Sequence, residues 1–282
     1  MPSGIFSKRP QRAIVVELFG LPGSGKTFLT QELTQILQKG PHSVLDFRRS
    51  TSPQFYLQDR IPRLSTTWIK EQLSFRFWIL ANPIAACHLW RQLSKSQQPD
   101  RNAYRYFFRS WIKTLVRLRR AVQSYDIVLM DQGFLQFVWT VGYESQAPQW
   151  PELRRHLLRL MPVPDAVILV ETSHDTATRR LTQRPGTTSR VERDGPGSPA
   201  VMQHASQLTA ELRHDLTTPR DNWGQTAFYP INNDRDAPPT AALTSIAERL
   251  LRQTSDAPTP APLPAAIKRS SASQRPAQST GP

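Results

Sequence analysis

The chain has 282 residues, of which 38% are hydrophobic, so it is long enough for one large α/β domain. Its formal net charge of +14 favours an anionic substrate, nucleic acid or anionic lipid as partner, without selecting among them. Its one cysteine, Cys87, excludes an intrachain disulfide and a cysteine-based zinc cluster, which suits the reducing cytoplasm.

Residues 1–12 are basic and lack a long apolar core, so we expect a flexible N-terminus and no secretory signal. The next segment, residues 13–33, contains the most specific motif in the chain. An apolar, β-branched run that stops at Gly20 predicts a strand, and residues 28–37 predict a helix. Between them, GLPGSGKT (20–27) matches G-x-x-x-x-G-K-[ST] in the strand-loop-helix context that a phosphate-binding loop requires.

The chemistry of this loop predicts a nucleotide site. Its glycines adopt backbone conformations closed to other residues, so that successive N–H groups surround phosphate oxygens at the positive end of the helix dipole. Lys26 would bind the β- and γ-phosphates, and the Thr27 hydroxyl would ligate Mg²⁺. We therefore expect ATP and Mg²⁺ as cofactors, bound by Gly20, Gly23, Ser24, Gly25, Lys26, Thr27 and Phe28.

Residues 43–47 predict a second strand. Arg48 and Arg49 follow it, and they either hold an acceptor substrate at the carboxyl end of the sheet or are solvated loop residues. Residues 65–97 predict helix with a break at Pro83. Because charged and polar residues interrupt its apolar stretch 73–90, we expect no transmembrane segment.

Residues 102–123 predict an amphipathic helix, since aromatic and aliphatic residues recur at i, i+3, i+4 and i+7. Basic residues repeat every four positions on another face: Arg101, Arg105, Arg109, Lys113 and Arg117. Two interpretations stay open. Either this basic stripe binds an anionic membrane or nucleic acid, or it faces water while the aromatic face packs on the domain.

Residues 125–131, YDIVLMD, predict a buried third strand that ends in an acid. In P-loop proteins such an acid holds the magnesium shell or accepts a proton from the attacking hydroxyl, which makes Asp131 a candidate for both roles. The alternative is that Asp131 caps a helix predicted over 134–141.

Residues 164–172 predict a fourth parallel strand, followed by a helix over 176–183 that Thr172, Ser173 and Asp175 cap. Five arginines follow within region 179–197, on this helix (Arg179, Arg180, Arg184) and in the loop after it (Arg190, Arg193). They predict either a movable cover over the phosphates or a solvated basic loop.

The last elements that the sequence predicts are helices over 202–216 and 241–252 and a short strand over 227–231, after a linker and short helix at 148–160. These bound a domain over residues 13–252. Residues 253–282 are rich in Pro, Ala, Ser and Thr with almost no large apolar side chains, so they should be disordered.

Together, the phosphate-binding loop, the Asp131-Gln132-Gly133 segment and PDAVILVETSHDTATRRLTQR resemble the thymidylate kinase-like branch of P-loop nucleoside and nucleotide kinases. The matching positions in the last unit are Pro164, Asp165, Ala177, Arg180, Leu181 and Arg184. The resemblance implies that Arg180, Arg184 and Arg190 close over the ATP phosphates, while Lys26 and Asp131 act in catalysis. It also shows a departure, because Gln132 stands where the family commonly has arginine.

We thus predict a three-layer α/β/α P-loop NTPase fold with a parallel sheet, a helical insertion over 65–123 and a lid-like loop. The expected activity is transfer of the γ-phosphoryl group of ATP to a hydroxyl or phosphate of a small molecule, nucleoside or nucleotide. One alternative is an adenine-nucleotide ATPase switch that docks on nucleic acid or an anionic membrane through the basic helix. Another is a kinase that acts on a nucleic acid end.

Overall fold

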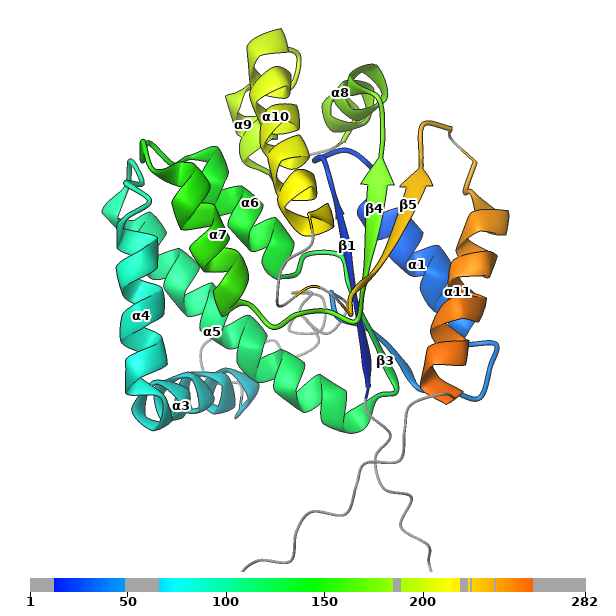
Figure 1. The fold of residues 1–282 in the computed structure, drawn as a ribbon, viewed down its shortest axis with the longest axis horizontal. Coiled ribbons are helices and arrows are strands. Elements are labelled where there is room, and N and C mark those ends of the chain that lie inside the picture. The colour runs from blue at the N-terminus through cyan, green and yellow to red at the C-terminus, as the bar shows by residue number, and fades with distance from the viewer. Residues whose placement is uncertain are drawn as a thin grey trace, which may run out of the picture.

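The computed structural model describes residues 13–48, 66–184, 189–218, 223, 225–235 and 237–255. Across these ranges five parallel strands form one sheet in the order β2-β3-β1-β4-β5 (Figure 1). They are β1 (Ile14–Gly20), β2 (Val44–Asp46), β3 (Ile127–Met130), β4 (Ala166–Glu171) and β5 (Ala227–Asn232). The predicted α/β class with a parallel sheet is therefore confirmed.

The described helices are α1 (Lys26–Leu37), α3 (Thr66–Ala81), α4 (Pro83–Ser94), α5 (Arg101–Ser124), α6 (Phe134–Tyr143), α7 (Trp150–Leu160), α8 (His174–Thr182), α9 (Arg190–Asp194), α10 (Pro199–Thr217) and α11 (Thr240–Ser255). Two boundaries are corrected. Residues 253–255 continue α11 rather than begin the tail, and residues 190–194 are helical because Ser189 and Glu192 form a capping box. The N-terminal segment 1–12, Arg49 and the tail from residue 256 lie outside the described residues.

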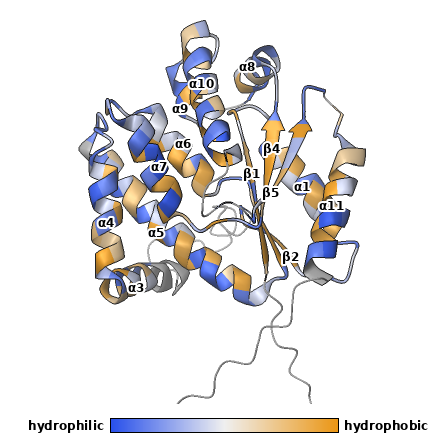
Figure 2. Ribbon diagram, in the orientation of Figure 1, coloured by the Kyte–Doolittle hydropathy of each residue, from blue (hydrophilic) through white to orange (hydrophobic). Residues whose placement is uncertain are grey.

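The sheet separates two apolar cores because its strands are buried on both faces. On one face, Val16 and Leu18 of β1 pack with α1 and α11. On the other, Phe19 packs with residues of α5, α6, α7 and α10. Figures 1 and 2 show these two helical layers and the apolar strands between them. The result is the predicted three-layer arrangement.

Helices α3, α4 and α5 lie between β2 and β3 in the chain, where the helical insertion is predicted. The aromatic face of α5 is buried in the core through Phe107, Trp111 and Ile112. Among the basic residues of this helix, Arg109 lies over the Phe75 ring of α3, with 6.0 Å from the guanidinium carbon to the ring centroid. This is the packing expected of a helix whose aromatic face belongs to its own domain. None of the described helices is long and apolar enough to cross a bilayer.

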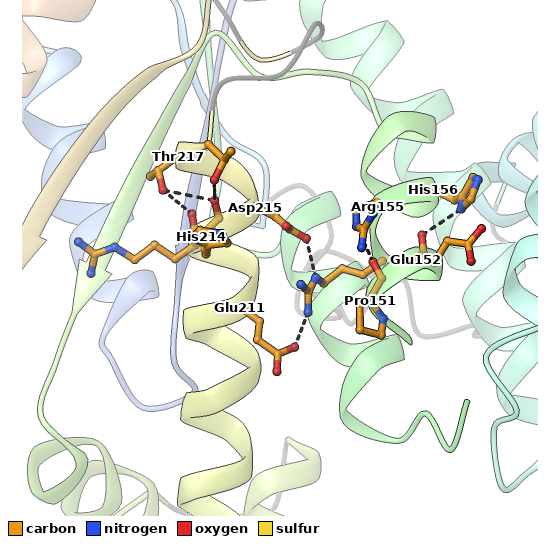
Figure 3. A network of polar contacts seen from close by, with 11 residues as sticks. Pro151, Glu152, Arg155, His156, Glu211, His214, Asp215 and Thr217 are labelled. Carbon is orange, nitrogen blue, oxygen red and sulfur yellow. Dashed lines mark hydrogen bonds and ion pairs between the residues drawn. The ribbon is translucent and has the colours of Figure 1, made fainter. Parts of the chain in front are cut away.

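A buried ion cluster joins α7 to α10 (Figure 3). The Arg154 Nε–H donates to Asp215 Oδ2 at 2.7 Å, and Arg154 also pairs with Glu211. Both α7 and α10 pack against α6, and the Trp139 indole N–H of α6 donates to Thr209 of α10 at 2.9 Å. The cluster therefore fixes the two helices that hold α6 against the sheet.

Candidate active site

The phosphate-binding loop lies between β1 and α1, as predicted. Gly23 and Gly25 adopt left-handed backbone angles, with φ of 84° and 86°, and Gly25 is the N-cap of α1. Gly20 does not, so the expected conformational freedom there is wrong. A Cβ at Gly20 would instead lie 2.4 Å from the Val170 carbonyl oxygen, so glycine is required by the close approach of β4.

Lys26 opens α1, two residues before the predicted helix start, and its ammonium group lies within the loop. Nζ donates to the carbonyl oxygens of Gly20 at 2.8 Å and Leu21 at 3.0 Å. Burial lowers the pKa of Lys26 to about 8, an effect that Asp131 opposes and Arg184 adds to. The lysine therefore sits at the loop as a partly buried cation with a proton that is unusually easy to remove.

Three polar side chains converge beside the loop. The Thr27 hydroxyl donates to Asp131 Oδ2 at 2.9 Å. Arg48, at the end of β2, donates from Nη1 to Thr27 Oγ1 at 2.7 Å and lies 3.5 Å from Asp131 Oδ2. Burial raises the pKa of Asp131, while the Thr27 hydrogen bond and the Arg48 charge oppose the shift. Asp131 thus lies beside the loop, and its alternative as a helix cap is wrong because Gly133 is the N-cap of α6.

The outer side of the loop is held by two residues from distant elements. The Ser24 carbonyl oxygen accepts from Asn233 Nδ2 at 2.7 Å. Arg180 donates to the carbonyl oxygens of Asn233 at 2.8 Å and Arg235 at 2.9 Å. Arg180 therefore ties α8 to the segment after β5, next to the loop. Asn233 was not predicted, since an asparagine after a strand carries no specific sequence signal.

The other predicted arginines line the same space from the region after α8. Arg184 lies beyond the end of α8, not on it, and its Nη1 is 3.7 Å from Glu192 Oε1. Arg190 begins α9, and its Nε is 2.7 Å from Glu144 Oε1. Its guanidinium also lies over the Phe107 ring, 5.0 Å from the centroid. Arg184 and Arg190 are thus brought to one side of the site by acidic neighbours.

A cavity of about 990 Å³ joins these groups. It is lined by the loop residues Gly23, Gly25, Lys26, Thr27 and Phe28, by Arg48 and Asp131, by Arg180, Arg184, Arg190 and Arg193, and by Tyr106, Phe107, Gln132, Gln136, Phe137, Trp139 and Thr140 among others. This volume lies at the upper end of the range of about 300–1,000 Å³ typical of small-molecule sites. The lining thus combines charged residues with aromatic and amide side chains, among them residues of α5 and α6.

Next to Gly133, which lines the cavity, lies a carboxyl group that the sequence analysis missed. Glu17, in the middle of β1, is 1% exposed and accepts a hydrogen bond from the Leu135 amide at 2.6 Å, in the first turn of α6. Burial raises the pKa of Glu17 to about 8. A Cβ at Gly133 would lie 2.4 Å from Glu17 Cδ. Glu17 thus takes the capping role that Gly133 has no side chain to fill, and so positions the start of α6. The sequence did contain a signal for Glu17, because it is an acidic residue inside an otherwise apolar predicted strand.

No family model and no curated protein matches this chain. Among solved structures, a deoxyadenosine kinase from M. mycoides with bound dATP is 14% identical with a TM-score of 0.47, covering 84% of this chain and 100% of that chain. A thymidylate kinase from Candida albicans is 12% identical with a TM-score of 0.47, covering 86% of this chain and 93% of that chain. Kinases of the predicted kind are therefore among the structural neighbours. With TM-scores below 0.5, they carry no argument about activity, which depends on the site itself.

Proposed function

We propose that this chain is an ATP-dependent phosphotransferase that moves the γ-phosphoryl group to a hydroxyl of a small molecule. The observation that carries the proposal is the hydrogen bond of 2.9 Å between Thr27 Oγ1 and Asp131 Oδ2. This pair and Lys26 line one cavity, which the aromatic residues Tyr106, Phe107 and Phe137 also line. It combines a phosphate-binding loop, a buried acid and room for a second substrate. These are the parts that phosphoryl transfer requires.

The residues present suit Mg²⁺, because Thr27 and Asp131 offer hard oxygen ligands at one point. Arg48 places positive charge on the same two oxygens, so Mg²⁺ would have to displace this guanidinium from them. Mg²⁺ held by Thr27 and Asp131 would neutralise phosphate charge. The loop amides and Lys26 would bind the polyphosphate, and Asp131 would orient the acceptor hydroxyl or accept its proton.

The arginines around the cavity would divide into two roles. Arg184 and Arg190 would face the charge that develops on the transferred group. Arg180, which donates to two backbone carbonyls beside the loop, would hold the nucleotide end of the site in shape. The region of residues 179–197 would close over the phosphates.

The acceptor would lie against the wall that α5 and α6 build. Tyr106, Phe107 and Phe137 offer aromatic surface for a flat or cyclic molecule, and Gln132 and Gln136 offer amide donors and acceptors. This lining favours a ring-containing acceptor such as a nucleoside or nucleotide. The helical insertion would then determine which acceptor is used.

The test is transfer of radiolabelled γ-phosphate from ATP to nucleosides, nucleotides, sugars and oligonucleotides. One small-molecule acceptor should be labelled, and Asp131→Asn should lower kcat about 10²- to 10⁴-fold, the usual contribution of a general base. Glu248→Gln, which neutralises an exposed carboxylate on α11, is the matched control and should leave kcat unchanged. Label transfer that survives Asp131→Asn in full would refute the assignment of Asp131.

A further inference from the structure

The corner between α3 and α4 exposes a row of large apolar side chains. Leu73, Phe77 and Leu80 on α3 are 59%, 73% and 79% exposed, and Ile84 at the start of α4 is 85% exposed. On α3 they are spaced by four and three residues, so they share one face of the helix. We call these four residues the apolar corner. Large exposed apolar patches mark interaction sites on soluble domains.

Helix α3 is apolar on two faces. Trp78 is buried, and Phe75 and Ile79 pack partly buried against the main core. The inward face therefore accounts for the folding of the insertion, and the apolar corner is additional. A helix with two apolar faces is normally covered on both of them. The apolar corner therefore needs a second cover.

Positive charge is concentrated in the three helices that carry the apolar corner. Residues 66–124, which form α3, α4 and α5, contain eleven Lys and Arg and two Asp and Glu, a net charge of +9 out of +14 for the whole chain. Arg76 is exposed on α3. Arg109 of α5 donates to Gln72 of α3 at 2.5 Å, and Arg120 of α5 contacts Ser74. Contacts from α5 thus place basic side chains beside α3.

We propose that the apolar corner is a docking surface for an anionic lipid bilayer, in which Leu73, Phe77, Leu80 and Ile84 enter the interface and the flanking arginines contact anionic headgroups. The combination of exposed Leu and Phe with basic neighbours is that of a surface that lies on a membrane rather than across it. The apolar stretch is too interrupted to span a bilayer. Docking on the bilayer surface would account for the exposure of Phe77 and Leu80.

Charge argues against the other occupants. A second copy of the chain would bring together two helical insertions that each carry a net charge of +9, and these repel each other. A nucleic acid would satisfy the arginines and leave Phe77, Leu80 and Ile84 exposed. An anionic bilayer satisfies both the charges and the apolar side chains. In Figure 1, α3 and α4 lie on the outer side of α5, away from the sheet.

The experiment is flotation of the full-length protein with vesicles of phosphatidylcholine, alone or mixed with phosphatidylserine. Binding should require phosphatidylserine and weaken partly with added salt. Phe77→Asp and Leu80→Asp should each lower the partition coefficient about tenfold or more, because each removes one inserted side chain. Arg76→Gln should lower it about fivefold. Val163→Asp, which places the same charge at an exposed apolar residue outside the corner, is the matched control and should bind as the original chain does.

Circular dichroism melting establishes that each variant is folded, and any variant that melts early is replaced by Phe77→Ser or Leu80→Ser. Three results would overturn the proposal. The first is no enrichment on anionic vesicles at low salt. The second is vesicle or oligonucleotide binding that salt abolishes and Phe77→Asp leaves unchanged. The third is a dimer in analytical ultracentrifugation that Phe77→Asp dissociates, which would make the corner a subunit contact.

Discussion

The carboxyl group of Glu17 gives a sharp prediction about the pH dependence of stability. Its pKa is raised from 4.5 to about 8 because it is buried, and the amides of Leu135, Gln136 and Phe134 only partly oppose this. Between pH 4.5 and 8 the folded chain therefore keeps a proton that the unfolded chain has released. The free energy of unfolding must fall as the pH rises through this window.

The magnitude follows from the width of the window. Each pH unit contributes about 1.4 kcal/mol, so the gap between 4.5 and about 8 corresponds to about 5 kcal/mol. Glu17→Gln removes this titration, and its amide oxygen still accepts from the Leu135 N–H. Relative to the variant, the original chain should lose about 4 kcal/mol of stability between pH 5 and pH 8.

The assay is urea unfolding of the original chain and Glu17→Gln at several pH values across this range. Because both proteins share all other titrating groups, the difference between their free energies of unfolding isolates Glu17. Glu248→Gln, at an exposed carboxylate, should run parallel to the original chain. Parallel curves for Glu17→Gln as well would refute the claim that this carboxyl group is protonated in the folded protein.

Three further predictions follow from the same structure. Gly133→Ala should cost about 1–3 kcal/mol of stability in urea unfolding, since its Cβ would meet the carboxyl group beneath it at 2.4 Å. The control is Gly197→Ala, where a Cβ has no neighbour within 4 Å and the stability should change little. Because the pKa of Lys26 is about 8, ATP affinity in calorimetry should fall up to about tenfold per pH unit above pH 8, and a flat profile would contradict this. Arg154→Met should cost about 3–5 kcal/mol in thermal or urea unfolding because it breaks a buried ion cluster from one side. Its exposed neighbour Arg155→Met should stay close to the original chain.

The parts of the site that sequence reasoning predicted are those that depend on local spacing. The loop GLPGSGKT follows from one contiguous motif, and Asp131 follows from its place at the end of an apolar strand. The order of strands and helices followed from apolar periodicity in the same way. Short helix α9 was missed although its capping box, Ser189 and Glu192, is also a local signal.

The parts that were missed depend on contacts between residues far apart in the chain. Asn233 reaches the Ser24 carbonyl across 209 positions, and Glu17 reaches the Leu135 amide across 118. Periodicity also predicts that α3 has apolar faces, yet it does not distinguish a face that packs from one that is exposed. The outward direction of Phe77 was therefore available only from the fold.

The measurement that tests the nucleotide site most directly is calorimetric titration of the full-length chain with ATP and Mg²⁺ at neutral pH. A single binding event should be seen, and Lys26→Ala should weaken it about tenfold to hundredfold because it removes a charged contact to phosphate. Absence of heat together with an unchanged melting temperature, or equal affinity in Lys26→Ala, would contradict the assignment of this cavity to ATP.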